Sequence, residues 1–187
     1  MPRIYGRFLP LSVVLVFMVS MTACNRSGPD AKGDRAKPSP REAGKLPAGL
    51  FLSEALPDAK HVLAVKGEAQ KGDTVVVRGR IGGRKEPFVE GRAMFTLTDL
   101  SIPTCADMPG DGCPTPWDYC CEPAEKVVTG SLTVQVVDAA GKPLKTGLKG
   151  AASLKPMAEV VVKGRVSQKQ GEQVFVLDAI GIFAKKT

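Results

Sequence analysis

The residues of this 187-residue chain best suited to chemistry are four closely spaced cysteines. They are Cys105, Cys113, Cys120 and Cys121, with the spacing C-x7-C-x6-C-C, and we call them the cysteine cluster. Thiols at this density serve either as covalent cross-links or as ligands of a metal ion. The compartment in which the chain resides helps to decide between these two uses.

The fifth cysteine, Cys24, stands at the end of an N-terminal export signal. Arg3 and Arg7 precede an apolar run from about Phe8 to Met18, which is too short to span a membrane and fits the apolar region of a signal peptide. The sequence Met21-Thr22-Ala23-Cys24 then resembles a bacterial lipobox, with Met in the place that is usually Leu. An uncleaved N-terminal anchor is the alternative interpretation.

The lipobox resemblance implies that residues 1–23 are a signal peptide and that Cys24 is the lipid attachment site. Two or three acyl chains on one cysteine anchor a protein stably. Residues 24–47 then form the lipidated N-terminus and a flexible linker, rich in Pro and Gly and almost without large apolar residues. We expect a membrane-anchored lipoprotein of the bacterial cell envelope, with its domain facing the periplasm or the exterior.

Disulfide bonds are the first interpretation of the cysteine cluster, because exported proteins meet an oxidising compartment. A Cys120–Cys121 bond would close a strained ring. The remaining pairings are Cys105–Cys120 with Cys113–Cys121, or Cys105–Cys121 with Cys113–Cys120. Each bond would contribute about 3 kcal/mol of stability by restricting the unfolded chain. On this interpretation we expect no cofactor.

A metal site is the second interpretation, in which four thiolates hold Zn²⁺ or a soft copper ion, Cu(I). The spacing lacks the C-x2–4-C pairs of familiar zinc sites. The only histidine, His61, lies far from the cluster along the chain. Redox chemistry is the third interpretation, with a Cys120–Cys121 disulfide acting as a switch.

Two aromatic residues, Trp117 and Tyr119, lie directly before the Cys120-Cys121 pair. Exposed Trp and Tyr side chains are good anchors for a binding partner. They are therefore predicted to form a recognition tip. The alternative for Trp117 is that it covers the open end of a barrel.

The elements that position these residues are expected to be mainly β. Alternating apolar residues predict five strands, at 75–81, 93–98, 132–137, 159–166 and 173–184. A short helix is predicted before them, at 57–66. Two of the strands share the pattern V-V-V-x-G-R, which places Gly79 and Gly164 at equivalent positions. A glycine inside a strand often marks a sharp bend or a close approach of two backbones.

Five strands with a break between the third and the fourth resemble an OB-fold, a small five-stranded Greek-key barrel. The resemblance covers about residues 72–185, within a single domain at 48–187, and a small β-sandwich is the alternative. The cysteine cluster then lies in a loop of about 30 residues, from Asp99 to Thr129, between the second and third strands. Loops of this length are usually functional or need extra cross-links.

Composition narrows the class of function. Lys and Arg exceed Asp and Glu by 26 to 19, but the charges are spread along the chain, as on an ordinary soluble surface. Aromatic residues are only 5% of the chain, which makes nucleic acid an unlikely partner, because single strands need aromatic stacking platforms. A single histidine leaves little basis for nucleophilic catalysis.

We therefore expect a non-catalytic binding module for an unknown protein, glycan or small ligand, stabilised by disulfides in the 105–121 loop. OB-folds commonly bind oligosaccharides, oligonucleotides or proteins. The first alternative is a metal-handling protein that uses the cysteine cluster as a Zn or Cu site. The second alternative is nucleic-acid or oligosaccharide binding of the OB type.

Overall fold

A computed structural model of the chain describes residues 44–110 and 112–185. These residues fall within one compact unit, Ser39–Thr187. The predicted signal peptide, the predicted lipid attachment site Cys24 and most of the predicted linker lie outside the described residues.

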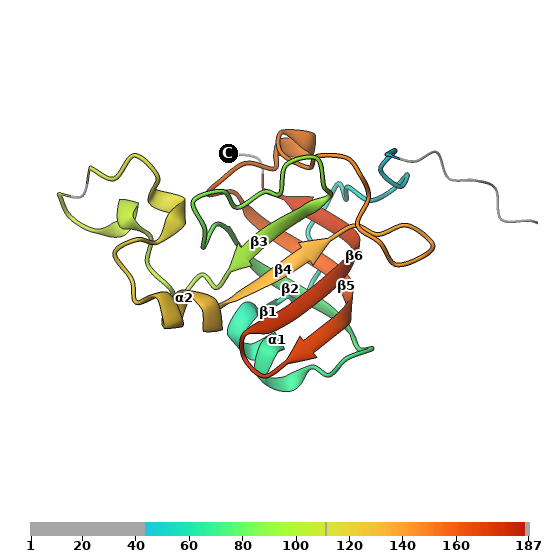
Figure 1. The fold of residues 1–187 in the computed structure, drawn as a ribbon, viewed down its shortest axis with the longest axis horizontal. Coiled ribbons are helices and arrows are strands. Elements are labelled where there is room, and N and C mark those ends of the chain that lie inside the picture. The colour runs from blue at the N-terminus through green and yellow to red at the C-terminus, as the bar shows by residue number, and fades with distance from the viewer. Residues whose placement is uncertain (1–43, 111, 186–187) are drawn as a thin grey trace, which may run out of the picture. The chain divides into compact units, whose positions relative to one another are not determined.

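The described chain is mainly β, with six strands in one mixed sheet and a few short helices (Figure 1). The strands are β1 (Lys60–His61), β2 (Thr74–Ile81), β3 (Met94–Thr98), β4 (Ser131–Gln135), β5 (Glu159–Gln170) and β6 (Val174–Ala184). The α-helices are α1 (Val62–Glu68) and α2 (Ala124–Thr129), and the 3₁₀ helices are η1 (Cys105–Asp107), η2 (Pro116–Asp118) and η3 (Ala151–Ser153).

The strands pair in the order β1-β2-β3-β4-β6-β5, and β5 also pairs with β2. The β2–β5 pairing is long, from Thr74 opposite Arg165 to Arg80 opposite Glu159. The β2–β3 pairing is short and joins Arg80 to Thr98 and Ile81 to Leu97. The β1–β2 and β4–β6 pairs are parallel, and the other pairs are antiparallel.

The prediction of a mainly β chain is confirmed, but the prediction of five strands is wrong because β1 adds a sixth. Lys60 and His61 pair with β2, and Asp58 before them has a positive φ of 57°. Helix α1 consequently begins at Val62, where the sequence predicted a helix from Pro57. A strand of two residues carries too little alternation to be recognised.

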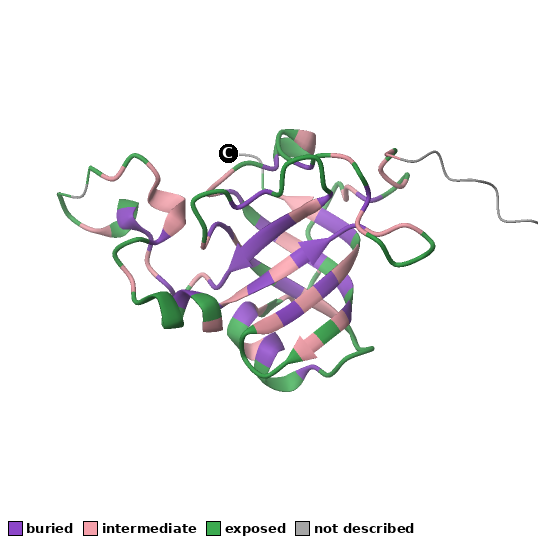
Figure 2. Ribbon diagram, in the orientation of Figure 1, coloured by how far each residue is buried: buried purple, intermediate pink, exposed green. Residues whose placement is uncertain are grey.

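The main core is formed by the inward faces of the strands, where buried and exposed residues alternate (Figure 2). Val77, Phe95, Val162 and Leu177 belong to it, and α1 adds Val62 and Val65. This alternation is the pattern from which the strands were predicted, since successive side chains of a strand point to opposite faces.

Gly79 and Gly164 lie where two backbones approach closely, as the repeated strand pattern predicts. A β-carbon at Gly79 would lie 2.7 Å from the carbonyl oxygen of Thr98. At Gly164 it would lie 2.7 Å from the carbonyl oxygen of Asp178 and 2.6 Å from the Leu177 side chain. Neither position leaves room for a larger residue.

The chain between β3 and β4, residues 99–130, carries the cysteine cluster, and we call it the cysteine segment. It projects to one side of the strands and ends in α2 (Figure 1). Its buried apolar residues form a small second cluster of Ile102, Tyr119 and Val127, separate from the main core. So small an apolar cluster buries little surface with which to hold the segment together.

Candidate metal centre

Cys105 is placed by a tight N-terminal turn of η1. Asp107 accepts hydrogen bonds from the backbone N–H and the hydroxyl of Thr104, both at 2.8 Å. These bonds satisfy donors at the start of the helix, as capping side chains commonly do. Cys105, the first residue of η1, is then almost fully buried, with 1% of its surface exposed.

Cys120 is placed by Asp118, the last residue of η2. One oxygen of Asp118 accepts a hydrogen bond from the Thr115 hydroxyl at 2.8 Å, and the other accepts the backbone N–H of Cys120 at 2.9 Å. Tyr119 between them adopts a left-handed conformation, with a φ of 59°. This conformation is uncommon for a bulky residue, and the buried tyrosine ring and the Asp118 bonds hold it in place.

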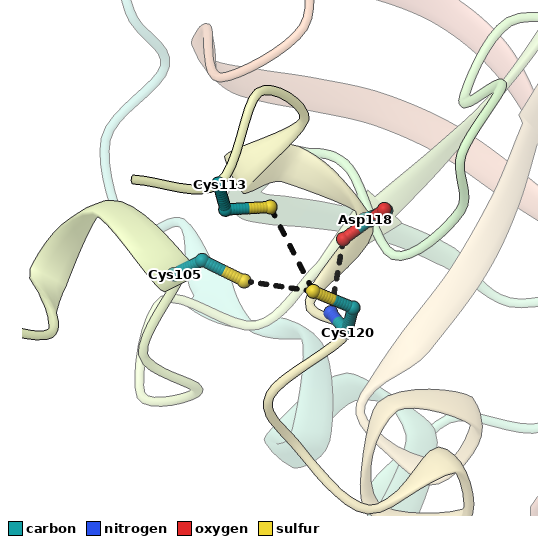
Figure 3. Close-up of side chains that lie close together, drawn as sticks. All are labelled: Cys105, Cys113, Asp118 and Cys120. Carbon is teal, nitrogen blue, oxygen red and sulfur yellow. Dashed lines mark hydrogen bonds between the residues drawn. The ribbon is translucent and has the colours of Figure 1, made fainter. Parts of the chain in front are cut away.

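As a result, the sulfur atoms of Cys105 and Cys113 both point toward that of Cys120 (Figure 3). Sγ of Cys120 lies 3.4 Å from that of Cys105, 3.7 Å from that of Cys113 and 4.0 Å from that of Cys121. These contacts are not disulfide bonds, whose length is about 2.05 Å. Around an ion with bonds of about 2.3 Å to sulfur, tetrahedral ligands would be separated by about 3.8 Å. The three distances measured from the Cys120 sulfur lie close to this separation.

A carboxylate lies beside the sulfur atoms. The ligand atoms of Cys105, Cys113, Asp118 and Cys120 all lie within 4.8 Å of one another. Burial raises the pKa of Asp118, but its hydrogen bonds from Thr115 and Cys120 outweigh that effect and hold the pKa below its usual value. Asp118 is consequently an ionised carboxylate at neutral pH.

The four thiols differ in their surroundings. Burial disfavours the Cys105 thiolate, but hydrogen bonds from the backbone and side chain of Cys121 and from the side chains of Cys120 and Cys113 outweigh burial and lower the Cys105 pKa. The pKa of Cys120 is raised, chiefly by its hydrogen bonds to Cys105 and Cys113. Cys120 and Cys121 are exposed, so the cluster is anchored at Cys105 and opens to solvent at its other end.

The cysteine segment is fixed to the strands by contacts that the sequence did not reveal. The Arg80 guanidinium lies 3.6 Å from the Asp107 carboxylate and 3.8 Å from that of Glu159 in β5. A β-carbon at Gly82 would lie 2.7 Å from the carbonyl oxygen of Trp117 and 2.8 Å from the Tyr119 ring. The Gly82-Gly83 pair, directly after the predicted strand at 75–81, was the one available sequence signal of this close approach.

Of the two aromatic residues predicted to form a recognition tip, Tyr119 is buried and Trp117 is partly exposed. Tyr119 has only 1% of its surface exposed, which contradicts the prediction that it presents its ring to a partner. Trp117 is half-buried, and its indole N–H donates to the carbonyl of Lys85 at 3.0 Å. The physical reason is that the segment has few apolar residues, so the Tyr119 ring packs with Ile102 and Val127.

His61 is not part of the cysteine cluster. It lies in β1, where its Nε2 is 2.5 Å from the Arg78 guanidinium. The four cysteines of the predicted site are brought together, and Cys24, the predicted lipid attachment site, lies outside the described residues.

No protein-family model matches the chain, and no curated protein or solved structure is significantly similar to it. Across the described residues, the helices are too short or too polar to cross a membrane. The inference of function therefore rests on the geometry of the site.

Proposed function

We propose that this protein binds one thiophilic metal ion, Zn²⁺ or Cu(I), at the cysteine cluster. The observation that carries the proposal is the convergence of the sulfur atoms, with Cys120 within 4.0 Å of three other sulfurs. Two disulfides would place the sulfurs in two bonded pairs, each at about 2.05 Å. The metal-handling alternative from the sequence therefore fits the geometry better than disulfide cross-links.

The chemistry of the donors supports the class of ion. Thiolates select zinc and Cu(I), whereas Mg²⁺, Ca²⁺ and Mn²⁺ prefer oxygen ligands. Cys120 and Cys121 are exposed, so an ion or an external thiol has direct access to the centre from solvent. This openness favours a site that takes up and releases its ion over a closed structural site. The proposed role is non-catalytic.

We place this centre on an OB-like Greek-key barrel within a single domain at 48–187. The support is the ring of pairings β2-β3-β4-β6-β5, which returns to β2. In that arrangement the cysteine segment joins the second and third strands of the barrel. The lipobox-like sequence ending at Cys24 supports anchoring in the bacterial envelope, with a linker that lifts the domain off the membrane.

Metal titration of the reduced chain tests the proposed function. The Cys24→Ser variant removes the lipid and keeps the cysteine cluster, and we expect it to bind one Zn²⁺ or one Cu(I) per chain. Cys105→Ser in the same background should weaken binding at least tenfold, because it removes the buried ligand. Equal binding by the two proteins, or none by either, would contradict the proposed function.

The lipid anchor is tested separately by membrane fractionation. The unmodified chain should remain with the membranes, and Cys24→Ser should appear in the soluble fraction. Retention of Cys24→Ser in the membranes would indicate an uncleaved N-terminal anchor.

A further inference from the structure

Two groups compete for the fourth position beside the sulfurs of Cys105, Cys113 and Cys120. One is the Asp118 carboxylate, with an oxygen within 4.8 Å of all three sulfurs. The other is Cys121, whose sulfur lies 4.0 Å from that of Cys120 but outside the group of ligand atoms that all lie within 4.8 Å of one another. The choice decides whether the centre is all-sulfur or mixed, and hence which ions it prefers.

Both oxygens of Asp118 already have partners in the local structure. One accepts the Thr115 hydroxyl, and the other accepts the backbone N–H of Cys120, as the dashed line in Figure 3 shows. These bonds close η2 and fix the backbone of a cysteine in the cluster. A carboxylate that orients a metal ligand in this way acts from outside the coordination sphere.

Cys121 contacts two of the other three cysteines. Its backbone and side chain hydrogen-bond to Cys105, and its sulfur neighbours that of Cys120. Cys120 and Cys121 directly follow Tyr119, whose buried ring and left-handed backbone set the direction of the chain there. Cys120 and Cys121 are thereby held next to the same group of sulfur atoms.

We infer that the proposed metal centre is an all-sulfur site, with Cys105, Cys113, Cys120 and Cys121 as ligands and Asp118 as a positioning residue. The inference rests on the proposed function. Four thiolates in a tetrahedral arrangement suit Zn²⁺ and its analogues Co²⁺ and Cd²⁺. An oxygen ligand from Asp118 would make the site harder and less selective for thiophilic ions.

Cobalt is the probe for this inference. In reduced Cys24→Ser protein loaded with Co²⁺, the sulfur-to-cobalt charge-transfer absorption grows with the number of bound thiolates. Cys121→Ser should lose about a quarter of this absorption per bound cobalt, as expected when three of four sulfur ligands remain. Cys113→Ser is the matched control and should lose the same share.

The Asp118 variants should differ from the cysteine variants in their cobalt absorption. Asp118→Asn should keep the full charge-transfer absorption and weaken cobalt binding about tenfold. It should bind more tightly than Asp118→Ala, because the Asn side-chain carbonyl can still accept the N–H of Cys120. Tighter binding by Asp118→Asn than by Asp118→Ala, with an unchanged absorption spectrum, is the behaviour expected of a positioning residue.

The result that would overturn the inference is a reversed pattern. If Cys121→Ser keeps the parent absorption while Asp118→Asn changes its shape and intensity, the fourth ligand is the carboxylate. A parent protein that shows no charge-transfer absorption with Co²⁺ contradicts the proposed function itself, and the ligand set with it. The far-UV circular dichroism of each variant identifies any that fails to fold.

Discussion

At the scale of the residue, Lys66 of α1 contacts the backbone where the cysteine segment meets β4. Its ammonium is largely buried and donates to the carbonyl oxygens of Ser131 at 2.7 Å and Val128 at 3.1 Å. Lys66 thus joins α1 to the end of α2 and the start of β4. Burial lowers its pKa from 10.5 to about 8, and the charge of Glu172 opposes the shift.

The lowered pKa of Lys66 gives a pH dependence of stability with a definite sign. Between about pH 8 and pH 10.5 the unfolded chain binds more protons at Lys66 than the folded chain does. The free energy of unfolding contributed by this group therefore increases as pH rises through that window. We expect Lys66→Met to remove this increase in urea unfolding measured across the window.

The matched control for Lys66 is Lys163→Met, at an exposed position of β5. The Lys163→Met variant should keep the pH dependence of the parent protein, since it retains Lys66. An unchanged pH dependence in Lys66→Met would show that the buried ammonium does not contribute as described.

At the scale of the element, the strands that position the site were largely predictable, because period-two alternation directly reflects one buried face. The repeated V-V-V-x-G-R pattern also located the close approaches at Gly79 and Gly164. Strand β1 was not predictable, because its two residues are defined by pairing with β2 and not by their own pattern.

The convergence of the cysteines could not be read from their spacing. It depends on the left-handed backbone of Tyr119 and on the hydrogen bonds of Asp118, neither of which has a sequence signature of its own. The Arg80–Asp107 ion pair joins residues of β2 and η1, whose proximity arises only in the folded chain. The four cysteines could therefore be predicted as a cluster from the sequence, but their three-dimensional arrangement could not.

The crowding at Gly164 predicts a cost for any side chain in the middle of β5. Gly164→Ala would press a methyl group against the Leu177 side chain and the Asp178 carbonyl. We expect a loss of about 1 to 3 kcal/mol in the free energy of unfolding by urea.

Gly67→Ala is the control for this prediction, since nothing lies within 4 Å of a β-carbon there and Gly67 is inside α1. It should stabilise the protein by up to about 1 kcal/mol, as alanine favours helix. Equal stability of the two variants would mean that the strands do not approach as closely at Gly164 as described.

At the scale of the whole molecule, the described chain has two apolar clusters of very different size. The strands and α1 share the large one, whereas the cysteine segment has only Ile102, Tyr119 and Val127. The segment therefore depends on its polar contacts and, in our proposal, on the bound ion. The strands do not need the ion for their own packing.

Removal of the ion should therefore affect the cysteine segment and leave the strands intact. Trp117, the only tryptophan of the chain, reports on that segment alone. We expect a chelator to change the Trp117 fluorescence of the metal-loaded protein while the far-UV circular dichroism of the strands is retained. Cys105→Ser should show no fluorescence response. A parallel loss of both signals would mean that the ion holds the whole domain together.

Mass spectrometry of the protein isolated without added reductant or metal tests most directly whether the cysteine cluster holds an ion. We expect one zinc or copper ion per chain under native conditions, and four intact thiols in the cysteine cluster after denaturation. A metal-free chain, lighter by the hydrogens lost in forming two disulfides, would contradict this expectation and would show that the cysteines cross-link the segment.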